Sequence, residues 1–453
     1  MLKSARNLFI PTFIFIVMIG AVLSTPIWAD PSVKVKLAVF SDPHYFAPEY
    51  VKEGQAFDTY LAHDRKLLAE SKAILSKTVE SIRKTDSQIV LVTGDLTKDG
   101  EKLSHTQVAA CLKELRDDGK QVYVVPGNHD INNPKAVQYE GSKTIPVDRI
   151  TPDDFREIYH DYGYDQAIAQ DPDSLSYVVQ PVPGLWILAI DSCSYDNNKN
   201  KGIPVTGSGL NAKRLSWIFD QLKAAREQNI MVFGMMHHGL MPHFSTEKTL
   251  FSNYIVDDWE NIAGKFADMG MKVIFTGHFH AQDIATTQTK NNQSIYDIET
   301  GSLVTYPCPY RLIELTRDKI DIETETIREI DYNTQGKPFP QYAADFLSHG
   351  ISEMVPQFLT DLFVKRGMAL KDAKIAAGQL AAVKLTPTFT LQALIADALK
   401  SHFVGDEVYD TTRSNLVSKL QASYNQKIRL LGNFLYSLYN DTPPPDNNVI
   451  IKF

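Results

Sequence analysis

The sequence predicts a mixed α/β (α+β) protein with an added helical domain at its C-terminal end. Short apolar runs alternate with segments of helical periodicity up to about residue 280, the pattern of strands and their covering helices. Composition shifts near residue 331, where a turn-rich stretch leads into helical patterns. With 453 residues, the chain is long enough for a large domain and a smaller partner. We expect these domains at residues 30–330 and 331–453.

Nine short apolar runs are predicted to be strands. The first six are rich in Val, Ile, Leu, Met and Phe and are bounded by Gly or Asp, which suits strands buried on both faces, except that Lys34 and Lys36 alternate with the apolar residues of the first. The last three would complete a second sheet. The predicted strands are residues 33–40, 89–93, 122–125, 186–190, 230–236, 273–276, 294–298, 311–315 and 319–323.

Helix starts are recognisable between these runs. Thr151-Pro152 is a cap followed by a first-turn proline, and Asn211 begins another helix. Ser104 and Gln107 match a capping box. In the C-terminal part, helices are expected at 343–363, 391–403 and 412–439, and an edge strand at 449–453. This part has no clustered polar site, so we expect it to serve packing rather than chemistry.

Composition and charge exclude some classes of protein. The chain is 43% hydrophobic and 22% charged, with 46 Lys plus Arg against 54 Asp plus Glu, a net charge of −8. Nothing in this balance suggests a groove for a nucleic-acid duplex, which would need a basic stripe. Three widely separated cysteines, Cys111, Cys193 and Cys308, allow at most one disulfide.

The N-terminal segment has the layout of a secretory signal. Lys3 and Arg6 precede an apolar stretch at 8–23, and small residues lead to a cleavage site after Ala29. We expect residues 1–29 to be removed, leaving an exported protein, secreted or associated with the cell envelope, with no stable membrane span. The alternative is an uncleaved membrane anchor, although Pro11 interrupts the apolar stretch.

Residue types that bind metals follow five of the apolar runs. Because the carboxyl ends of such strands meet at one edge of a sheet, these distant residues should converge. Buried carboxylates and imidazoles need compensation, which divalent cations supply, so the arrangement indicates a two-metal hydrolase. In chain order the runs end in Asp42-Pro43-His44, Gly94-Asp95, Gly127-Asn128-His129-Asp130, His237-His238 and Gly277-His278-Phe279-His280. Asp191 follows another run and is expected to be a cap or a structural carboxylate.

Two cations about 3.5–4 Å apart can activate a bridging hydroxide for attack on phosphorus. The expected ligands are Asp42, His44, His280 and Asp95 for one cation, and Asn128, His237, His278 and the shared Asp95 for the other. The mixture of nitrogen and oxygen donors favours Mn, Fe, Zn or Co over Mg or Ca.

His129 is predicted to act on the substrate. As an imidazolium it could stabilise phosphoryl oxygens and donate a proton to the leaving oxygen, with Asp130 orienting its ring. Asn128 is also placed at the substrate, whereas His238 is either near the substrate or a satisfied buried group. The other histidines are expected at surface or structural positions: His63, His105, His160, His243, His349 and His402. Tyr159, Tyr162 and Tyr164 line either a pocket or a half-buried helix face.

The five blocks, in this order, resemble the calcineurin-like metallophosphoesterase superfamily over roughly residues 33–330. This resemblance implies a four-layer αββα sandwich and the same ligand roles. Lys98 stands where the purple acid phosphatases of this superfamily have a tyrosine ligand, and His44 stands where they have a non-ligand. Together with residues 299–303, both features look more like the class III cyclic nucleotide phosphodiesterases.

The resemblance implies a dinuclear metal-dependent phosphodiesterase acting on a small phosphate ester, with cyclic nucleotides as the expected substrates. One alternative is a phosphomonoesterase or a lipid-headgroup phosphodiesterase, because the same core cleaves several kinds of ester. Another is a non-catalytic cell-envelope binding protein that has kept the fold. The apolar faces of the helical domain could seal a homo-oligomer or merely cover the sandwich.

Overall fold

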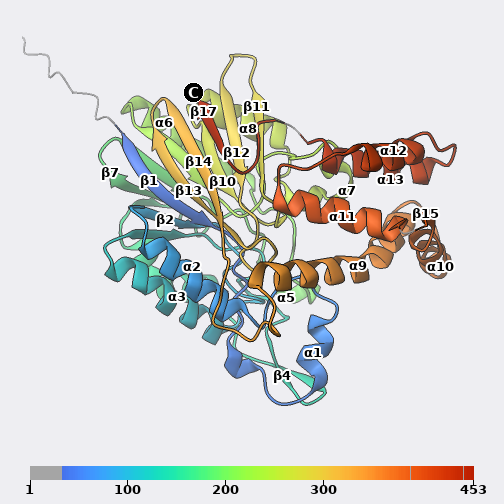
Figure 1. The fold of residues 1–453 in the computed structure, drawn as a ribbon. Coiled ribbons are helices and arrows are strands. Elements are labelled where there is room, and N and C mark those ends of the chain that lie inside the picture. The colour runs from blue at the N-terminus through green and yellow to red at the C-terminus, as the bar shows by residue number, and fades with distance from the viewer. Residues whose placement is uncertain (1–32, 388, 442) are drawn as a thin grey trace, which may run out of the picture. The chain divides into compact units, whose positions relative to one another are not determined.

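The computed structural model describes residues 33–387, 389–441 and 443–453, and the signal segment predicted at 1–29 lies outside them. Two large sheets form the centre of the fold (Figure 1). The six-stranded sheet has the order β17-β14-β13-β1-β2-β3. Its strands are β1 Lys34–Phe40, β2 Ile89–Val92, β3 Gln121–Val124, β13 Pro309–Thr316, β14 Lys319–Thr326 and β17 Val449–Lys452.

The second sheet has seven strands in the order β11-β12-β10-β9-β8-β7-β6. These are β6 Ala167–Gln170, β7 Tyr177–Val182, β8 Leu185–Ala189, β9 Met231–Met235, β10 Val273–Thr276, β11 Asp283–Gln288 and β12 Ser294–Glu299. Two small hairpins pair β4 Val137–Glu140 with β5 Lys143–Pro146 and β15 Lys384–Thr386 with β16 Phe389–Thr390. All nine predicted strands and the predicted edge strand are confirmed. Strands β4 to β7, β11, β15 and β16 were not predicted.

The two sheets pack face to face between helices. In β8, Leu185 and Ile187 belong to the apolar cluster shared with the first sheet, whereas Trp186 and Leu188 belong to a cluster on the opposite face. Helices α2 Ser71–Arg83 and α3 Lys102–Asp117 pack on the first sheet, and α6 Ala212–Glu227 and α8 Trp259–Asp268 pack on the second. The result is the expected four-layer αββα sandwich, in which the central strands of both sheets are buried on both faces.

Strand direction brings the predicted ligands to one rim. Strands β1, β2 and β3 run parallel, and so do β8, β9 and β10. The five predicted ligand blocks follow β1, β2, β3, β9 and β10 directly. In each sheet, the loops with the predicted ligands therefore lie at the carboxyl ends of the parallel strands. We call this edge of the two sheets the rim.

Two of the predicted helix starts are confirmed and one is wrong. Thr151 caps α4, Pro152–Ile158, in a capping box with Asp154, and Asn211 caps α6. Ser104 lies inside α3, where its hydroxyl accepts a hydrogen bond from the Ala47 amide instead of capping the helix. The remaining helices of the sandwich part are short: α1 Gln55–Leu61, α5 Asn198–Lys201 and α7 Glu247–Leu250.

The described residues of the C-terminal part form five helices, α9 to α13, which we call the helical region. They are α9 Phe339–Lys365, α10 Leu370–Ala381, α11 Leu391–Val404, α12 Thr411–Gln421 and α13 Gln426–Tyr439. The first two helices predicted there are confirmed. The single helix predicted at 412–439 is wrong, because the chain turns after Gln421 and Asn425 caps a new helix.

The helical region shares an apolar core with the sandwich. Phe244 and Phe279, from loops of the sandwich, are buried in one cluster with residues of α9 to α13. The chain then returns to the sandwich, where β17 pairs with β14. The three cysteines are free thiols. Within the described residues, none of the helices combines the length and apolar composition that crossing a membrane requires.

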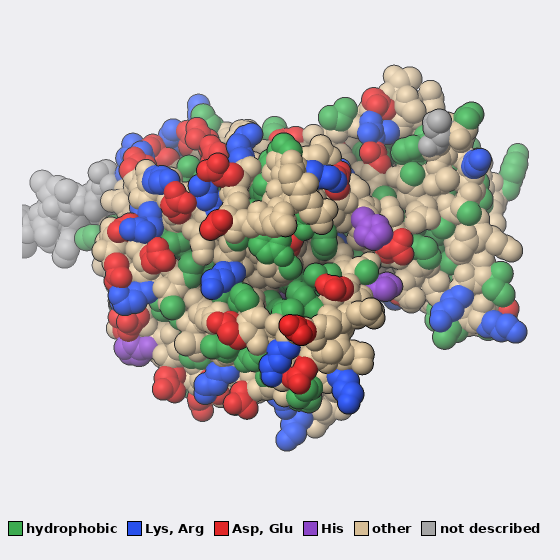
Figure 2. Space-filling view, turned by 60° about the horizontal axis from the view of Figure 1, so that its bottom comes forward, with side chains coloured by type: hydrophobic (Ala, Val, Ile, Leu, Met, Phe, Trp, Pro, Cys, Tyr) green, Lys and Arg blue, Asp and Glu red, His purple; other side chains and the backbone are tan. Residues whose placement is uncertain are grey.

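Acidic and basic side chains are interspersed over the face shown in Figure 2, with no single-sign stripe. This face therefore offers no extended basic surface of the kind that binds a nucleic-acid backbone.

Candidate metal centre

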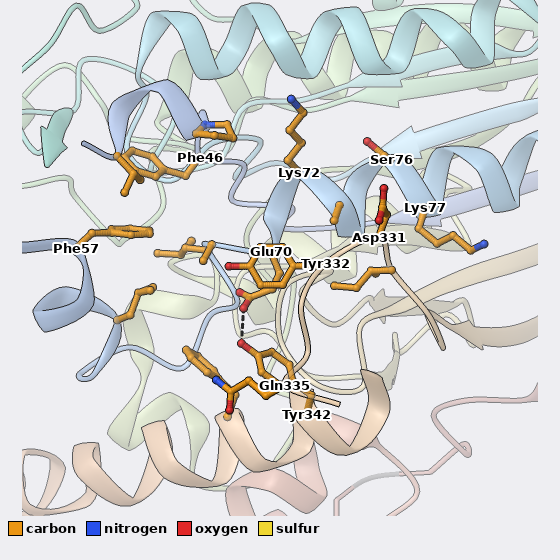
Figure 3. A pocket seen from close by; sticks show the side chains of 18 of the residues that line it. Phe46, Phe57, Glu70, Lys72, Ser76, Lys77, Asp331, Tyr332, Gln335 and Tyr342 are labelled. Carbon is orange, nitrogen blue, oxygen red and sulfur yellow. Dashed lines mark hydrogen bonds between the residues drawn. The ribbon is translucent and has the colours of Figure 1, made fainter. Parts of the chain in front are cut away.

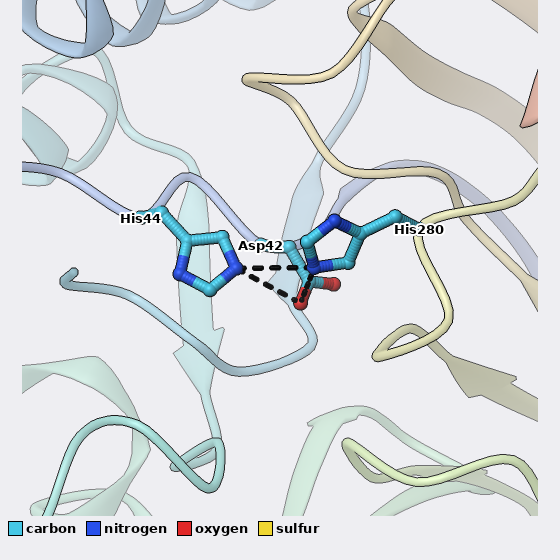
Figure 4. A group of neighbouring side chains, drawn as sticks. All are labelled: Asp42, His44 and His280. Atoms are coloured by element: carbon cyan, nitrogen blue, oxygen red, sulfur yellow. Dashed lines mark hydrogen bonds and ion pairs between the residues drawn. The ribbon is translucent and has the colours of Figure 1, made fainter. Parts of the chain in front are cut away.

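Two groups of potential ligands lie at the rim, and the first consists of Asp42, His44 and His280 (Figure 4). His280 Nε2 lies 3.3 Å from Asp42 Oδ1 and 3.1 Å from His44 Nε2. His44 Nε2 lies 3.7 Å from the same Asp42 oxygen. Three donor atoms from two loops, all buried, thus face one small volume.

The second group consists of Asp95, His237 and His278, whose ligand atoms lie within 4.8 Å of one another. His237 Nε2 lies 3.4 Å from Asp95 Oδ2. Asn128 joins this group, because its Oδ1 lies 3.1 Å from His237 Nε2. The structure therefore brings together all seven side chains predicted as ligands.

Asp95 lies between the two groups. Its Oδ2 is 3.6 Å from His44 Nε2 and 3.4 Å from His237 Nε2. Its Oδ1 accepts a hydrogen bond from the His129 amide at 2.8 Å, which fixes the orientation of the carboxylate. This is the position that a carboxylate shared by two cations requires.

The ligand loops have an unusual backbone. Among the described residues, twelve non-glycine residues have positive φ, and five of them are predicted ligands: Asp42, His44, Asp95, His278 and His280. Such conformations cost free energy and cluster at functional sites. Close approach also requires glycine, since a Cβ on Gly127 would lie 2.1 Å from Asp95 Oδ1, and one on Gly277 would lie 1.9 Å from Ser41 Oγ.

The donors fit divalent cations. Burial lowers the pKa of His44 well below its usual value and that of His280 to about 4, so both rings are neutral, the form that can bind a metal. Burial would raise the pKa of Asp95, but His237 and His129 beside it hold that pKa well below the usual range. Asp42 Oδ1 is buried and accepts no hydrogen bond. A cation would satisfy this oxygen and the facing ring nitrogens together.

His129 stands beside the ligands and is the most exposed of these side chains, at 26%. Its Nδ1 lies 2.8 Å from the Lys98 carbonyl and 3.1 Å from Asp99 Oδ1, while its Nε2 lies 3.9 Å from Asp95 Oδ2. Burial opposes its charge, but Asp95 and Asp99 outweigh burial and raise the pKa of His129. The ring therefore has the charge and the placement of a proton donor.

The predicted role of Asp130 is wrong. Its carboxylate accepts hydrogen bonds from the amides of Gly127, Leu96 and Thr97, so it ties two loops together rather than holding the ring of His129. Geometry explains the difference, because the neighbour in sequence points away from the ring.

Asp99 is the orienting residue that the sequence analysis missed. It lies in the loop after β2, contacts His129 Nδ1 and pairs with the buried ammonium of Lys98. The nearest signal in the sequence is the Asp99-Gly100 pair four residues after Asp95, which is typical of a turn.

His238 is fully buried and packs against the predicted ligand His278, with ring centroids 4.6 Å apart, but both of its ring nitrogens contact protein groups. Its Nδ1 lies 2.8 Å from Ser192 Oγ and its Nε2 lies 2.9 Å from the Thr206 carbonyl. Burial lowers the pKa of His238 to about 3. Of the two alternatives, the satisfied buried group is correct and the substrate contact is not.

Other predicted side chains are structural. Asp191 accepts hydrogen bonds from the amides of Leu175 and Cys193 and from the Tyr195 hydroxyl, as expected of a structural carboxylate. The side chains of Tyr159, Tyr162 and Tyr164 are buried in the main core, so they line neither a pocket nor a half-buried face.

A cavity of about 1060 Å³ opens elsewhere, lined by Phe46, Phe57, Glu70 and Tyr342 among others (Figure 3). The Tyr342 hydroxyl donates a hydrogen bond to Glu70 across it. None of the predicted ligands lines this cavity, so we place the chemistry at the rim, where the donor atoms converge.

A four-layer sandwich with carboxylate, amide and imidazole donors at one rim defines the class of metallophosphoesterases. The model of the calcineurin-like phosphoesterase family matches residues 35–282, more than half of the chain. The chain therefore belongs to this family of metal-dependent hydrolases of phosphoric esters. A dinuclear metal site is typical of the family. No curated protein matches the chain in sequence.

Solved structures with similar folds are distant. A dimetal phosphatase from Danio rerio is 13% identical, with a TM-score of 0.45, over 64% of this chain and 96% of its own. The purple acid phosphatase PPD1 from yellow lupin is 10% identical (TM-score 0.39; 65% and 52% covered). The NAD nucleotidase NadN from Haemophilus influenzae is 13% identical (TM-score 0.35; 78% and 61% covered). At these scores the likenesses say nothing about the substrate.

Proposed function

We propose that this protein is a two-metal phosphodiesterase that hydrolyses a small phosphodiester of the cyclic nucleotide class. The observation that carries the proposal is the convergence of two ligand groups on Asp95, with the imidazole of His129 beside them. Lys98, whose ammonium pairs with Asp99, occupies the position of the tyrosine ligand in purple acid phosphatases, which favours the phosphodiesterase-like branch.

Seven side chains would bind the two cations. Asp42, His44 and His280 would hold one cation, Asn128, His237 and His278 the other, and Asp95 both. When bound, such a cation pair polarises phosphoryl oxygens and lowers the pKa of water.

His129 keeps its Nε2 directed to the side of Asp95 because its Nδ1 is held by the Lys98 carbonyl and Asp99. From there the protonated ring stabilises a phosphoryl oxygen and gives its Nε2 proton to the leaving oxygen.

A substrate panel tests the proposal. The secreted form is loaded with Mn, Fe, Zn or Co and assayed with bis-p-nitrophenyl phosphate, p-nitrophenyl phosphate and a cyclic nucleotide, with Asp95→Asn as the control. We expect the diester and the cyclic nucleotide to be hydrolysed faster than the monoester, and Asp95→Asn to be inactive. Preference for the monoester would instead indicate a phosphomonoesterase. No hydrolysis with any metal would indicate a binding protein.

We also propose that the protein is exported, on the basis of the layout of residues 1–29. Terminal sequencing of the protein recovered outside the cytoplasm should begin at Asp30. If the recovered chain starts at Met1 and sediments with membranes, the segment is an anchor. Light scattering of the same sample tests whether the helical region makes a homo-oligomer.

A further inference from the structure

A further group of potential ligands lies outside the candidate metal centre, where the helical region meets the sandwich. It consists of Asp283 at the start of β11, His402 near the end of α11, and Asp441 just after α13. One ligand atom from each lies within 4.8 Å of the others. Glu407, Asp441 and Asp446 form an adjoining group that shares Asp441. These groups share no residue with the candidate metal centre.

Several of these polar atoms are buried and unsatisfied. Both carboxylate oxygens of Asp283, which is fully buried, make no hydrogen bond, and neither does Nε2 of His402, which is 1% exposed. Asp441 Oδ2 also has no hydrogen-bond partner. Leaving such groups unpaired is costly, so their persistence indicates a missing ligand.

His243 approaches the same carboxylates from the loop after β9. Its Nδ1 lies 2.9 Å from Asp283 Oδ1 and its Nε2 lies 3.2 Å from Asp297 Oδ2, yet neither contact has the geometry of a hydrogen bond. Donor atoms that lie close without pointing at each other are expected around a cation, where each lone pair is directed at the ion.

The acidic and basic groups of this region also favour a bound cation. Seven carboxylates meet in this region: Glu247, Asp283, Asp297, Glu299, Glu407, Asp441 and Asp446. The basic groups among them are His243, His402 and Arg311, and the guanidinium of Arg311 donates to the backbone carbonyls of Glu299 and Asp446. Acidic groups therefore outnumber basic ones, and burial raises the pKa of Asp283, Glu299 and Asp441; a cation would stabilise their ionised forms.

Hydrogen bonds within the protein already satisfy some of these carboxylates. Asp297 accepts from the Leu240 and Met241 amides and from the Thr276 hydroxyl. Asp446 accepts from the Ile284 and Asp406 amides. Glu247 and Glu299 accept from the His243 and Ala281 amides, and Glu407 Oε1 lies 2.9 Å from His402 Nδ1. Of the seven, Asp283 and Asp441 are the ones with buried oxygens that have no hydrogen-bond partner.

We propose that Asp283, His402 and Asp441 bind a further divalent cation, with His243 beside it, and that this cation fastens the helical region to the sandwich. Mixed imidazole and carboxylate donors suit zinc or manganese better than calcium or magnesium. The three ligands come from segments far apart in the chain, so binding stabilises the folded state, in which alone they meet.

Zinc content of the full-length protein tests the proposal. Purified wild type, His402→Gln and Asp441→Asn are dialysed against zinc, and bound zinc is measured by mass spectrometry. We expect each variant to hold one zinc fewer than wild type while still hydrolysing p-nitrophenyl phosphate. Asp165→Asn is the matched control, because the His160, Asp161 and Asp165 group has a similar composition but is exposed. It should keep the wild-type zinc content.

Asp95→Asn separates this site from the metal centre. It should lose zinc from the centre and lose a further equivalent when combined with Asp441→Asn. Equal zinc content in wild type and both single variants would overturn the proposal. If the variants fail to fold, anomalous diffraction from zinc-soaked wild-type crystals decides. A peak between Asp283 and His402 supports the site, and the absence of a peak there overturns it.

Discussion

His129 is 26% exposed, whereas the side chains of the seven predicted ligands around it are buried. A phosphate ester that approaches the rim must therefore meet this imidazole. Asp95 and Asp99 raise the pKa of His129, which favours the protonated ring that a leaving oxygen needs. At the scale of single residues, the predicted ligands are thus buried, whereas His129 beside them is exposed enough to act on the substrate.

Replacing His129 by Ala tests this separation. We expect kcat for p-nitrophenyl esters to fall about 10²- to 10⁴-fold, the usual contribution of general acid catalysis. Metal content, measured by mass spectrometry, should stay at the wild-type value, because the seven ligands remain. Metal loss in proportion to the loss of activity would mean that His129 is itself a ligand.

Asp99 acts through His129, so its replacement should have a milder effect. Asp99→Asn should lower kcat about 10- to 100-fold, as is usual when a residue that orients a functional side chain is changed. KM and metal content should change little, since Asp99 touches none of the ligands. The control is Asp117→Asn, an exposed carboxylate paired with Lys113. A rise in KM with unchanged kcat would contradict the positioning role.

The convergence of the seven candidate ligands could be predicted because each stands in a loop directly after a recognisable strand, and parallel strands end at the same rim. The partner of His129 could not, because it depends on how a turn folds. Asp130 is adjacent in sequence but binds the amides of the Asp95 loop, whereas Asp99 reaches the ring from that loop.

At the scale of elements, burial on both faces made the central strands predictable. Several strands with exposed residues were missed, as in β5, where all four residues are exposed. Such strands form because they pair with neighbouring strands, and the local sequence pattern does not reveal this pairing. The capping box predicted at Ser104 does not form, and its cause is also a contact with a distant segment. The Ser104 hydroxyl accepts a hydrogen bond from the Ala47 amide. The box at Thr151 formed because its partner Asp154 is local.

The capping box of Thr151 and Asp154 should stabilise α4. Thr151→Ala should lower the free energy of unfolding by about 1 kcal/mol, the usual cost of losing a cap. Hydrogen bonds from Lys102 and Thr151 lower the pKa of Asp154 from 3.8 to about 2. Because this pKa is lower in the folded state, the contribution of Asp154 is present above pH 3.8 and is lost as pH falls toward 2.

Urea unfolding of wild type, Thr151→Ala and Asp154→Asn at several acid pH values measures both effects. The difference between wild type and Asp154→Asn should shrink as pH falls from 4 to about 2. A difference that grows over this range would contradict the assignment.

At the scale of the whole molecule, the helical region supports the metal centre. Phe279 stands between the ligands His278 and His280, and its ring packs against Phe244 and Phe251 in the core shared with the helical region. The sequence predicted the helices but not this support. It also predicted no polar cluster there, which is wrong, because Asp283, His402 and Asp441 meet only in the fold.

Substitutions of two phenylalanines in that core distinguish its contribution to stability from its support of the loop that carries His278 and His280. Phe279→Ala and Phe434→Ala should each destabilise the fold by about 3–5 kcal/mol, since both rings are buried. Only Phe279→Ala should also weaken metal binding, because it loosens the loop that carries two ligands. Metal titration of the folded variants measures this difference. Equal metal affinity in both would show that the helical region does not hold the ligand loop.

The most direct test of the binuclear centre is anomalous diffraction from a crystal grown with manganese. We expect two peaks about 3.5–4 Å apart, with Asp95 in contact with both. One peak should lie beside Asp42, His44 and His280, and the other beside Asn128, His237 and His278. A single ion at the rim, or a pair of ions that Asp95 does not touch, would contradict the account.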